Sequence, residues 1–263
     1  MRLAALVEGR MMKTKDAAIP LALAALFGAS FVAGLGNRPG GAAGFSPPAV
    51  VESAPVAVGS LHAAAPPEQT TGWDLPNLDH PRVDRWVEFF QTDGRDDFTV
   101  FLKRMPKYAP MISEKLAARG MPQDLVYLAM IESGFNPVAT SAAKAKGLWQ
   151  FIEPTAERYG LTVDRKVDER TDPEKSTEAA LSYLGDLYDR FGSWYLAAAA
   201  YNTGENRVGR IMRSVTGSEK GSEDDYYAIA ELLPQETADY VPLMIAAARI
   251  AKEPEKYGFD INA

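Results

Sequence analysis

The hydrophobic pattern predicts helices along most of the chain after residue 80. Apolar residues recur at helical spacing in the segments 83–90, 98–118, 122–133, 181–188, 194–201 and 234–252. We expect the second of these helices to be interrupted at Met105–Pro106, because an internal proline removes a backbone hydrogen bond. No alternating run of strand length stands out, although residues 151–163 fit a small irregular or extended piece. The predicted fold class is therefore mostly α.

The segment that starts at Pro122 carries the most informative residue. Leu125, Leu128 and Glu132 share one face of this helix, and Gly134 ends it shortly after Glu132. A carboxyl on a protein-facing stripe, at the negative end of the helix dipole, has its pKa raised. Such a carboxyl stays protonated near neutral pH and can act as a general acid. The alternative is a helix-end Glu that turns outward into solvent.

The N-terminal part of the chain has a targeting pattern. Lys13 and Lys15 precede a short apolar core at 19–32, so residues 1–36 read as an exported signal peptide. An uncleaved membrane anchor of about 20 residues is the close alternative. Residues 37–74 are rich in Pro, Gly and Ala and are predicted to form a disordered tether. We expect a helical extension over 75–118 and the main domain over 119–263.

The amino-acid composition excludes or disfavours several kinds of binding and catalytic site. The chain has 263 residues and a net charge of −7, so an excess of basic residues that would favour nucleic acid is absent. It has no cysteine, which excludes disulfides and thiol nucleophiles. Its two histidines, His62 and His80, precede the main domain, which disfavours Ser-His-Asp catalysis and histidine-ligated metals. We expect no metal and no cofactor, and acid–base chemistry from carboxylates, tyrosines or lysines.

Two other stretches combine aromatic and amide side chains. In the first, Gly147 would let backbone approach a ligand, and Trp149 and Gln150 offer the apolar face and the amide that sugars require. A core tryptophan at a helix start is the alternative. In the second, Tyr201 and Asn202 end the apolar helix 194–201 and need polar partners. A carboxyl with a raised pKa would be a suitable partner, whereas a tyrosine hydroxyl in solvent is the alternative.

Several sequence blocks resemble a known family. The blocks E-S-G-F-N-P (132–137), G-L-W-Q-F (147–151) and A-Y-N-T-G (200–204) are similar to those of lytic transglycosylases of the soluble-lytic-transglycosylase (SLT) type. The murein transglycosylase D group is the most similar, since residues 167–176 and 236–242 resemble it as well. The similarity covers residues 98–252. It implies a lysozyme-like, goose-type α domain that cleaves the β-1,4 MurNAc–GlcNAc bond of peptidoglycan.

The resemblance also implies roles for single residues. Glu132 matches the family's catalytic acid/base. Ser133 follows it as in the family, Ser141 and Gln150 match positions that contact substrate, and Tyr201 and Asn202 match the A-Y-N of the cleft. The other predicted substrate-binding residues, chosen for their own side chains and backbone, are Gly147, Trp149 and Tyr240. A buried core tyrosine explains Tyr240 nearly as well. Trp149 stands where many relatives have Met, and no LysM repeat follows the domain. The expected partner is the peptidoglycan glycan strand, and the expected protein is a monomer in the periplasm, with possible association of its N-terminus with the inner membrane.

The residues suggest a mechanism with a single acid. Most glycosidases use two carboxylates, but near Glu132 the sequence offers only Glu153, beside a turn, and Asp168, in a charged run. With one acid, the nucleophile would be the C6 hydroxyl of the substrate, and the product a 1,6-anhydro-muramyl end. Tyr201 is expected to donate a hydrogen bond to the Glu132 carboxylate and to restrain its raised pKa.

Three other functions remain open at this point. A hydrolytic muramidase of the same fold would leave a reducing end instead of an anhydro end. A non-catalytic peptidoglycan-binding module has no use for a buried acid, which argues against it. An adaptor anchored in the inner membrane is supported only by residues 1–36.

Overall fold

The computed structural model describes residues 72–76 and 79–260 of the chain. The predicted signal or anchor and nearly all of the predicted tether lie outside these residues. Within them, the regular structure is helical, and the only β pairing is a set of isolated bridges. The mostly α prediction is confirmed. In the part of the chain that the structure describes, no helix is both long and apolar enough to span a membrane.

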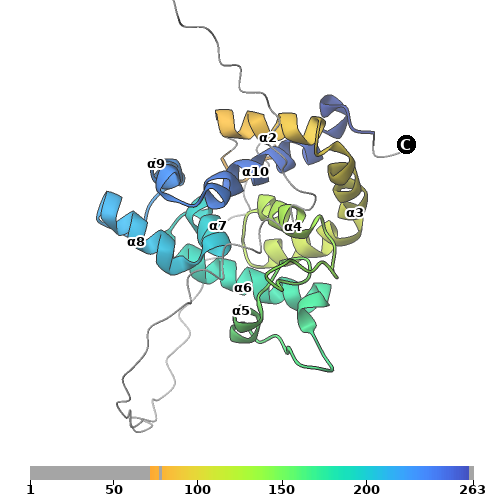
Figure 1. The fold of residues 1–263 in the computed structure, drawn as a ribbon, viewed down its shortest axis with the longest axis horizontal. Coiled ribbons are helices and arrows are strands. Elements are labelled where there is room, and N and C mark those ends of the chain that lie inside the picture. Colours follow the sequence, from red (N-terminus) through yellow and green to blue (C-terminus); the bar gives the residue numbers. More distant parts are fainter. Residues whose placement is uncertain (1–71, 77–78, 261–263) are drawn as a thin grey trace, which may run out of the picture.

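The helices follow one another through short connections (Figure 1). They are α2 (Pro81–Gln91), α3 (Arg95–Ala118), α4 (Val126–Ser133), α5 (Glu153–Arg158), α6 (Pro173–Phe191), α7 (Trp194–Thr203), α8 (Glu205–Thr216), α9 (Glu223–Ile229) and α10 (Gln235–Lys252). Short 3-10 turns are found at Gln123–Leu125, Glu169–Thr171, Ala230–Leu232 and Pro254–Tyr257.

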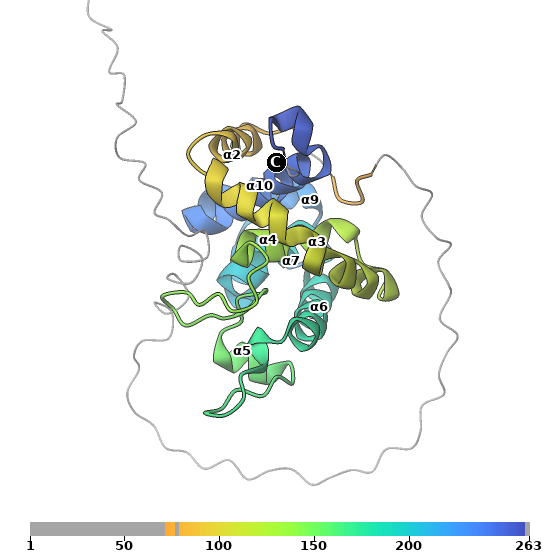
Figure 2. The ribbon, with the colours of Figure 1, turned by 90° about the vertical axis from the view of Figure 1, so that its right-hand side faces the viewer.

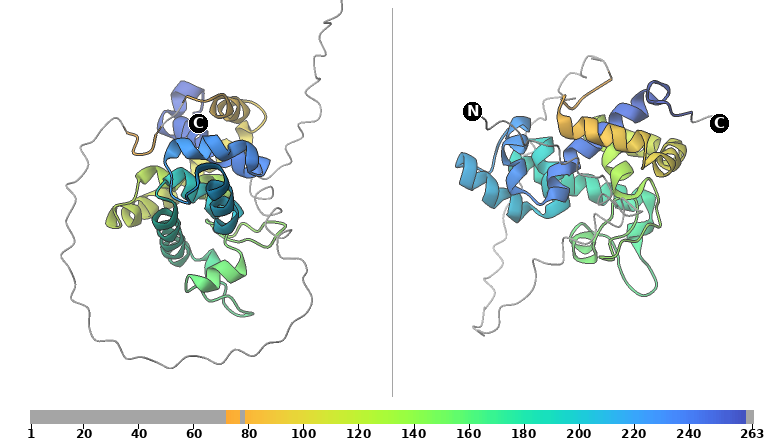
Figure 3. Two further views of the ribbon diagram at one scale, coloured as in Figure 1. Left: turned by 90° about the vertical axis from the view of Figure 1, so that its left-hand side faces the viewer. Right: turned by 45° about the horizontal axis from the view of Figure 1, so that its top comes forward.

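Helix α4 lies at the centre of the domain (Figures 1 and 2). It packs between α3 and α10, while α10 also packs against α2 and α7, and α6 against α3 and α7. Figure 3 shows α2 lying along α10 at the surface. All residues of α4, from Val126 to Ser133, are buried. No face of this helix is exposed to solvent, so the side chain of Glu132 is surrounded by protein.

Local sequence signals set most helix ends as expected. Asp172 caps α6 by accepting hydrogen bonds from the backbone N–H of Glu174 and Lys175, and Pro173 occupies the first turn. Gly134 ends α4 with a φ of 58°, in the left-handed region that glycine tolerates best. A side chain at Gly134 would also meet the ring of Phe101, with a contact of 2.0 Å.

One prediction about the helices is wrong. Helix α3 runs through Met105–Pro106 without interruption, and its buried face, which includes Phe98, Leu102 and Ile112, continues across the proline. The stretch 151–163 contains α5, and the small extended piece expected there is limited to isolated bridges at Phe151 and Val163. Residues 217–222 form the loop that joins α8 to α9. Helix α9 begins with a capping box between Ser222 and Asp225.

The end of the predicted tether is fixed on the domain at the start of α4. The backbone N–H groups of Asp74 and Leu75 donate to Asp124 Oδ2 at 3.0 and 3.1 Å. In return, Asp74 Oδ1 accepts from the backbone N–H of Asp124 at 2.9 Å. The ammonium of Lys252, on α10, lies 2.5 Å from Asp124 Oδ1. These contacts tie residues 72–76 to both α4 and α10.

Candidate active site

Glu132 lies in the last turn of α4 with 4% of its surface exposed. The hydroxyl of Tyr240, from the neighbouring helix α10, donates a hydrogen bond to Glu132 Oε1 at 2.5 Å. Tyr240 is itself fully buried. The carboxyl therefore faces the protein, as the sequence pattern predicts, and the alternative of an outward-facing Glu is wrong.

The surroundings of Glu132 favour its protonated form. Burial is the main cause and raises the pKa of Glu132 from 4.5 to about 8, with the charge of Glu236 acting in the same direction. The hydrogen bond from Tyr240 opposes this rise, since it stabilises the carboxylate. At neutral pH Glu132 is therefore protonated and can act as an acid. The hydroxyl of Tyr240 can stabilise the carboxylate that forms when the proton leaves.

Tyr201 does not make the hydrogen bond expected of it. Its hydroxyl donates to the carbonyl oxygen of Trp149 at 2.8 Å, so its proton is already used. The ring packs against Phe151 and Tyr183, with centroid distances of 6.3 and 5.2 Å. Burial raises the pKa of Tyr201, and the charge of Glu132 adds to that rise, so the two groups are near each other. Tyr240 takes the role that the sequence analysis assigns to Tyr201.

Two residues of the G-L-W-Q-F block serve the protein's own packing. Trp149 is fully buried and its indole N–H donates to Thr177 Oγ1 at 2.9 Å, so no face of the ring is open to a sugar. Gly147 has a φ of 84°, and a Cβ there would lie 1.8 Å from the carbonyl oxygen of Arg170. The close approach that requires glycine is to Arg170 and not to a ligand. For both residues the predicted substrate contact is corrected.

Gln150 keeps one polar atom without a partner. Its backbone has a φ of 47°, which is uncommon for a residue other than glycine. Its side-chain Nε2 donates to the carbonyl oxygens of Gly147, at 2.9 Å, and Ala139, at 3.4 Å. Its Oε1 is buried and accepts no hydrogen bond from any residue that the structure describes. This acceptor is buried, and substrate contact by Gln150 stays a prediction.

The two predicted site serines form hydrogen bonds with nearby backbone groups. Ser133 Oγ donates to the carbonyl oxygen of Leu148 at 2.9 Å and accepts from the N–H of Asn136 at 3.2 Å. Ser141 Oγ accepts from the N–H of Ala145 at 3.0 Å. Both serines are buried. Ser133 thereby connects the end of α4 to the G-L-W-Q-F block, while substrate contact by either serine stays a prediction.

Asn202 is hydrogen-bonded to Glu236, a carboxylate that the sequence does not single out. Its Oδ1 accepts from Thr237 Oγ1 at 2.7 Å, which fixes the amide so that Nδ2 donates to Glu236 Oε1 at 3.2 Å. Glu236 is partly exposed and lies one helical turn before Tyr240 on α10. The spacing of Glu236 and Tyr240 within the block 236–242 is the sequence signal that could have identified it.

The two carboxylates considered from the sequence have other surroundings. Asp168 forms ion pairs with Lys146 and Arg170, both at 2.8 Å. Glu153 is exposed at the start of α5. Neither is among the groups that shift the pKa of Glu132, whereas Glu236 is. Within residues 72–76 and 79–260, no group of three or more acidic or histidine side chains could hold a metal ion.

The sequence of this chain is similar to those of known proteins. Residues 110–223 match the sequence model of the Transglycosylase SLT domain. The chain is 42% identical over 157 residues to the membrane-bound lytic murein transglycosylase D of Escherichia coli strain K12, covering 59% of this chain and 34% of that protein. It is 35% identical over 169 residues to the membrane-bound lytic murein transglycosylase F of Maricaulis maris, with the same two coverages.

A solved structure is also similar. The 70 kDa soluble lytic transglycosylase of Escherichia coli shares 25% identity and a TM-score of 0.47 over 56% of this chain and 24% of that protein. The chain spans about a third of the length of the curated relatives named above (34%). The resemblance stated from the sequence blocks is confirmed, because residues 110–223 match the model of the Transglycosylase SLT domain.

Proposed function

We propose that this protein is a peptidoglycan lytic transglycosylase that cleaves the β-1,4 bond between MurNAc and GlcNAc without water. The observation that carries the proposal is the pair of Glu132 and Tyr240. A carboxyl with a pKa of about 8 holds a proton at neutral pH, and a tyrosine hydroxyl 2.5 Å away is ready to stabilise the anion left after transfer. One group can then serve as acid and afterwards as base.

The first step uses Glu132 as the acid. Its proton passes to the glycosidic oxygen, the bond from that oxygen to C1 of MurNAc breaks, and GlcNAc leaves as an alcohol. Positive charge develops at C1, where the N-acetyl oxygen of the same sugar supports it. Glu132 becomes a carboxylate, and the hydrogen bond from Tyr240 strengthens because its acceptor is now charged.

The second step uses Glu132 as the base. The carboxylate takes the proton of the C6 hydroxyl, and the C6 oxygen bonds to C1 to close the 1,6-anhydro ring. Because nucleophile and electrophile belong to one sugar, their effective molarity is high and exceeds that of entering water. The reprotonated Glu132 is ready for another turnover.

A hydrolytic muramidase is the second candidate, because Glu236 supplies a second carboxylate near Glu132. A retaining hydrolase needs its two carboxyl groups about 5–5.5 Å apart, with the second one free to attack C1. Glu236 Oε1 instead accepts from the Asn202 amide, whose orientation Thr237 fixes. This contact favours a supporting role for Glu236, and with it the transglycosylase.

The remaining parts of the proposal concern location and partners. The relatives named as membrane-bound murein transglycosylases, together with the basic and apolar pattern of residues 1–36, support export to the periplasm. Residues 37–71 would then tether the domain to a membrane if the signal is retained. The proposed partner is the glycan strand of peptidoglycan, which a monomer with one Glu132 can cleave.

Digestion of purified peptidoglycan sacculi tests this proposal. The wild-type protein is expected to release muropeptides whose muramic acid ends are 1,6-anhydro, identified by mass spectrometry before any chemical reduction. Reducing muramic acid ends would support the hydrolase instead. No release by a folded wild-type protein would leave only binding, which sedimentation with sacculi measures.

A further inference from the structure

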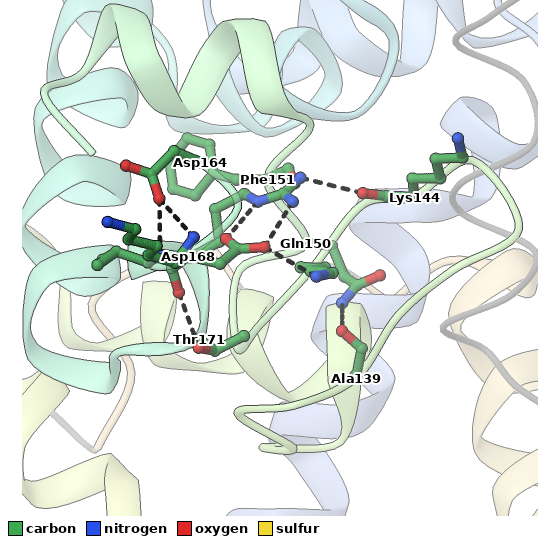
Figure 4. Close-up of polar contacts among 11 residues, drawn as sticks. Ala139, Lys144, Gln150, Phe151, Asp164, Asp168 and Thr171 are labelled. Atoms are coloured by element: carbon green, nitrogen blue, oxygen red, sulfur yellow. Dashed lines mark hydrogen bonds and ion pairs between the residues drawn. The ribbon is translucent and has the colours of Figure 1, made fainter. Parts of the chain in front are cut away.

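A buried arginine outside the acid–tyrosine pair holds the segment that carries Gln150. Figure 4 shows Gln150 with Lys144, Phe151 and Asp168 around it. Arg170 lies in the short turn Glu169–Thr171, and 4% of its surface is exposed. A guanidinium is seldom buried so deeply unless its charge and its N–H groups all find partners. Its partners therefore indicate what this residue does.

The guanidinium of Arg170 faces two ways. Nε and Nη2 donate to the two oxygens of Asp168, both at 2.8 Å, in a bidentate pair. Nη1 donates to the carbonyl oxygens of Lys144, at 3.1 Å, and Phe151, at 3.3 Å. These two carbonyls stand on either side of the block 147–150. One planar group thus joins both ends of the block to Asp168.

Two more contacts bind the same block. The ammonium of Lys146 pairs with Asp168 Oδ2 at 2.8 Å, and both cations lower the pKa of Asp168, so it stays ionised. The carbonyl oxygen of Arg170 lies where a side chain on Gly147 would stand, 1.8 Å from an added Cβ. The backbone of the block therefore rests directly on residue 170.

The other side of the block faces the proposed active site. The carbonyl oxygen of Leu148 accepts from Ser133, the residue after Glu132. The carbonyl oxygen of Trp149 accepts from Tyr201. Between them and the arginine, Gln150 adopts its φ of 47° and keeps a buried Oε1 without a partner among the described residues. A left-handed conformation in a residue other than glycine persists only when its neighbours enforce it.

We propose that Arg170 is a positioning residue that acts through Gln150. By holding the carbonyls of Lys144 and Phe151 together and supporting Gly147, it keeps the Gln150 amide turned so that Oε1 can accept a hydrogen bond from the sugar. This inference rests on the proposed function, since it names one contact of the same substrate. Arg170 itself touches no substrate.

A double-mutant cycle on soluble, uncrosslinked glycan strands tests the inference. The variants are Arg170→Gln, Gln150→Ala and the double variant. Arg190→Gln is the control, because it removes a half-buried arginine paired at 2.8 Å with Glu219 and without contacts to residues 139–151. Because one hydrogen bond to substrate is worth up to about tenfold, Arg170→Gln is expected to raise KM about five- to tenfold with kcat nearly unchanged.

In the cycle, Arg170→Gln is expected to add little to the effect of Gln150→Ala, since both remove the same contact. Arg190→Gln should change neither KM nor this coupling. Arg170→Lys keeps the charge beside Asp168 but cannot reach two carbonyls, so it should fold like the wild type and still raise KM. Amide hydrogen exchange of residues 139–151 should rise in both Arg170 variants and not in the control.

The outcomes separate the two proposals. Full additivity of Arg170→Gln and Gln150→Ala would overturn the positioning role. A fall in kcat at constant KM would also overturn it, because loss of folded enzyme alone lowers the apparent kcat and leaves KM unchanged. A folded wild-type protein that cleaves no glycan strand would overturn the proposed function, and this inference with it. In an active wild type, unchanged exchange of residues 139–151 in the Arg170 variants would reject only the inference.

Discussion

The hydroxyl of Tyr240 donates to the carboxyl of Glu132 at 2.5 Å, although 108 positions separate the two residues in the chain. The contact exists because α10 packs against α4 and both helices are buried along the side where they meet. Burial favours the proton on Glu132, and the hydroxyl favours its loss. A group that must give a proton and later take one back needs both influences.

The first prediction is that Glu132→Gln loses activity while keeping the fold. Glutamine has nearly the same shape, and its Oε1 can still accept the hydrogen bond from Tyr240. Since general acid–base catalysis is commonly worth about 10²–10⁴ in rate, muropeptide release from sacculi should fall by at least about 100-fold. A purified, folded Gln variant that keeps more than about a tenth of the wild-type rate would show that Glu132 is not the acid.

The second prediction compares two tyrosines that differ in their hydrogen-bond acceptors. The pH dependence of kcat/KM should fall above pH 8 in the wild type, because Glu132 with its pKa of about 8 then loses the proton that it must donate. Tyr240→Phe removes the hydrogen bond that lowers this pKa, so the alkaline limb should move to higher pH. The rate at neutral pH should also fall, because the carboxylate loses its donor.

Tyr201→Phe is the matched control for Tyr240→Phe. It removes one hydroxyl from a neighbouring ring, but that hydroxyl donates to the Trp149 carbonyl and not to Glu132. Its alkaline limb should coincide with that of the wild type. If Tyr201→Phe moved the limb and Tyr240→Phe did not, the assignment of the two hydroxyls would be reversed.

The sequence predicted the burial of Glu132 correctly and its hydrogen-bond partner incorrectly, for a physical reason. Periodicity together with the Gly134 signal shows that Glu132 faces the protein at a helix end, because these are local properties. Which tyrosine reaches it depends on how α7 and α10 cross α4, and no local signal contains that geometry. Tyr201 adjoins the site and donates elsewhere.

Burial likewise decided between alternatives that the sequence left open. Trp149 and Gly147 have the residue types of a sugar site, yet both are used inside the protein, against Thr177 and Arg170. Residue type alone cannot distinguish an exposed ring from a buried one. The uninterrupted α3 shows the same limit, since the packing of Phe98 and Ile112 outweighs the hydrogen bond that Pro106 removes.

The third prediction concerns stability and pH. Glu132 binds its proton more tightly in the folded state, with a pKa of about 8 against an ordinary 4.5. Between these values the folded protein holds a proton that the unfolded chain releases, so rising pH favours unfolding. The contribution of this group is complete below pH 4.5 and is lost as the pH approaches 8. At about 1.4 kcal/mol per pKa unit, the total is a few kcal/mol.

Urea unfolding of the wild type and Glu132→Gln at a series of pH values measures this effect. Glutamine does not titrate, so the free energy of unfolding of the variant relative to the wild type should increase steadily between pH 4.5 and 8 and stay constant above. Two parallel pH curves would mean that the carboxyl is not desolvated in the folded protein.

The last prediction is that the contact between Asp74 and Asp124 stabilises the domain at the start of α4. Asp74→Ala removes the acceptor for the backbone N–H of Asp124 and leaves that donor without its partner. A loss of about 1 kcal/mol corresponds to a decrease of about 2–4 °C in Tm for a domain of this size. Amide exchange in residues 122–126 should rise as well.

Asp79→Ala is the control for Asp74→Ala. Asp79 also pairs with the domain, at 2.9 Å from Arg249, but 98% of its side chain is exposed. Such surface pairs contribute little to stability because water and salt screen them, so this variant should melt with the wild type. Equal Tm values for all three proteins would mean that residues 72–76 rest on the domain without stabilising it. A lower Tm in Asp74→Ala alone would show that residues 72–76 stabilise the domain at the turn before the helix that carries Glu132.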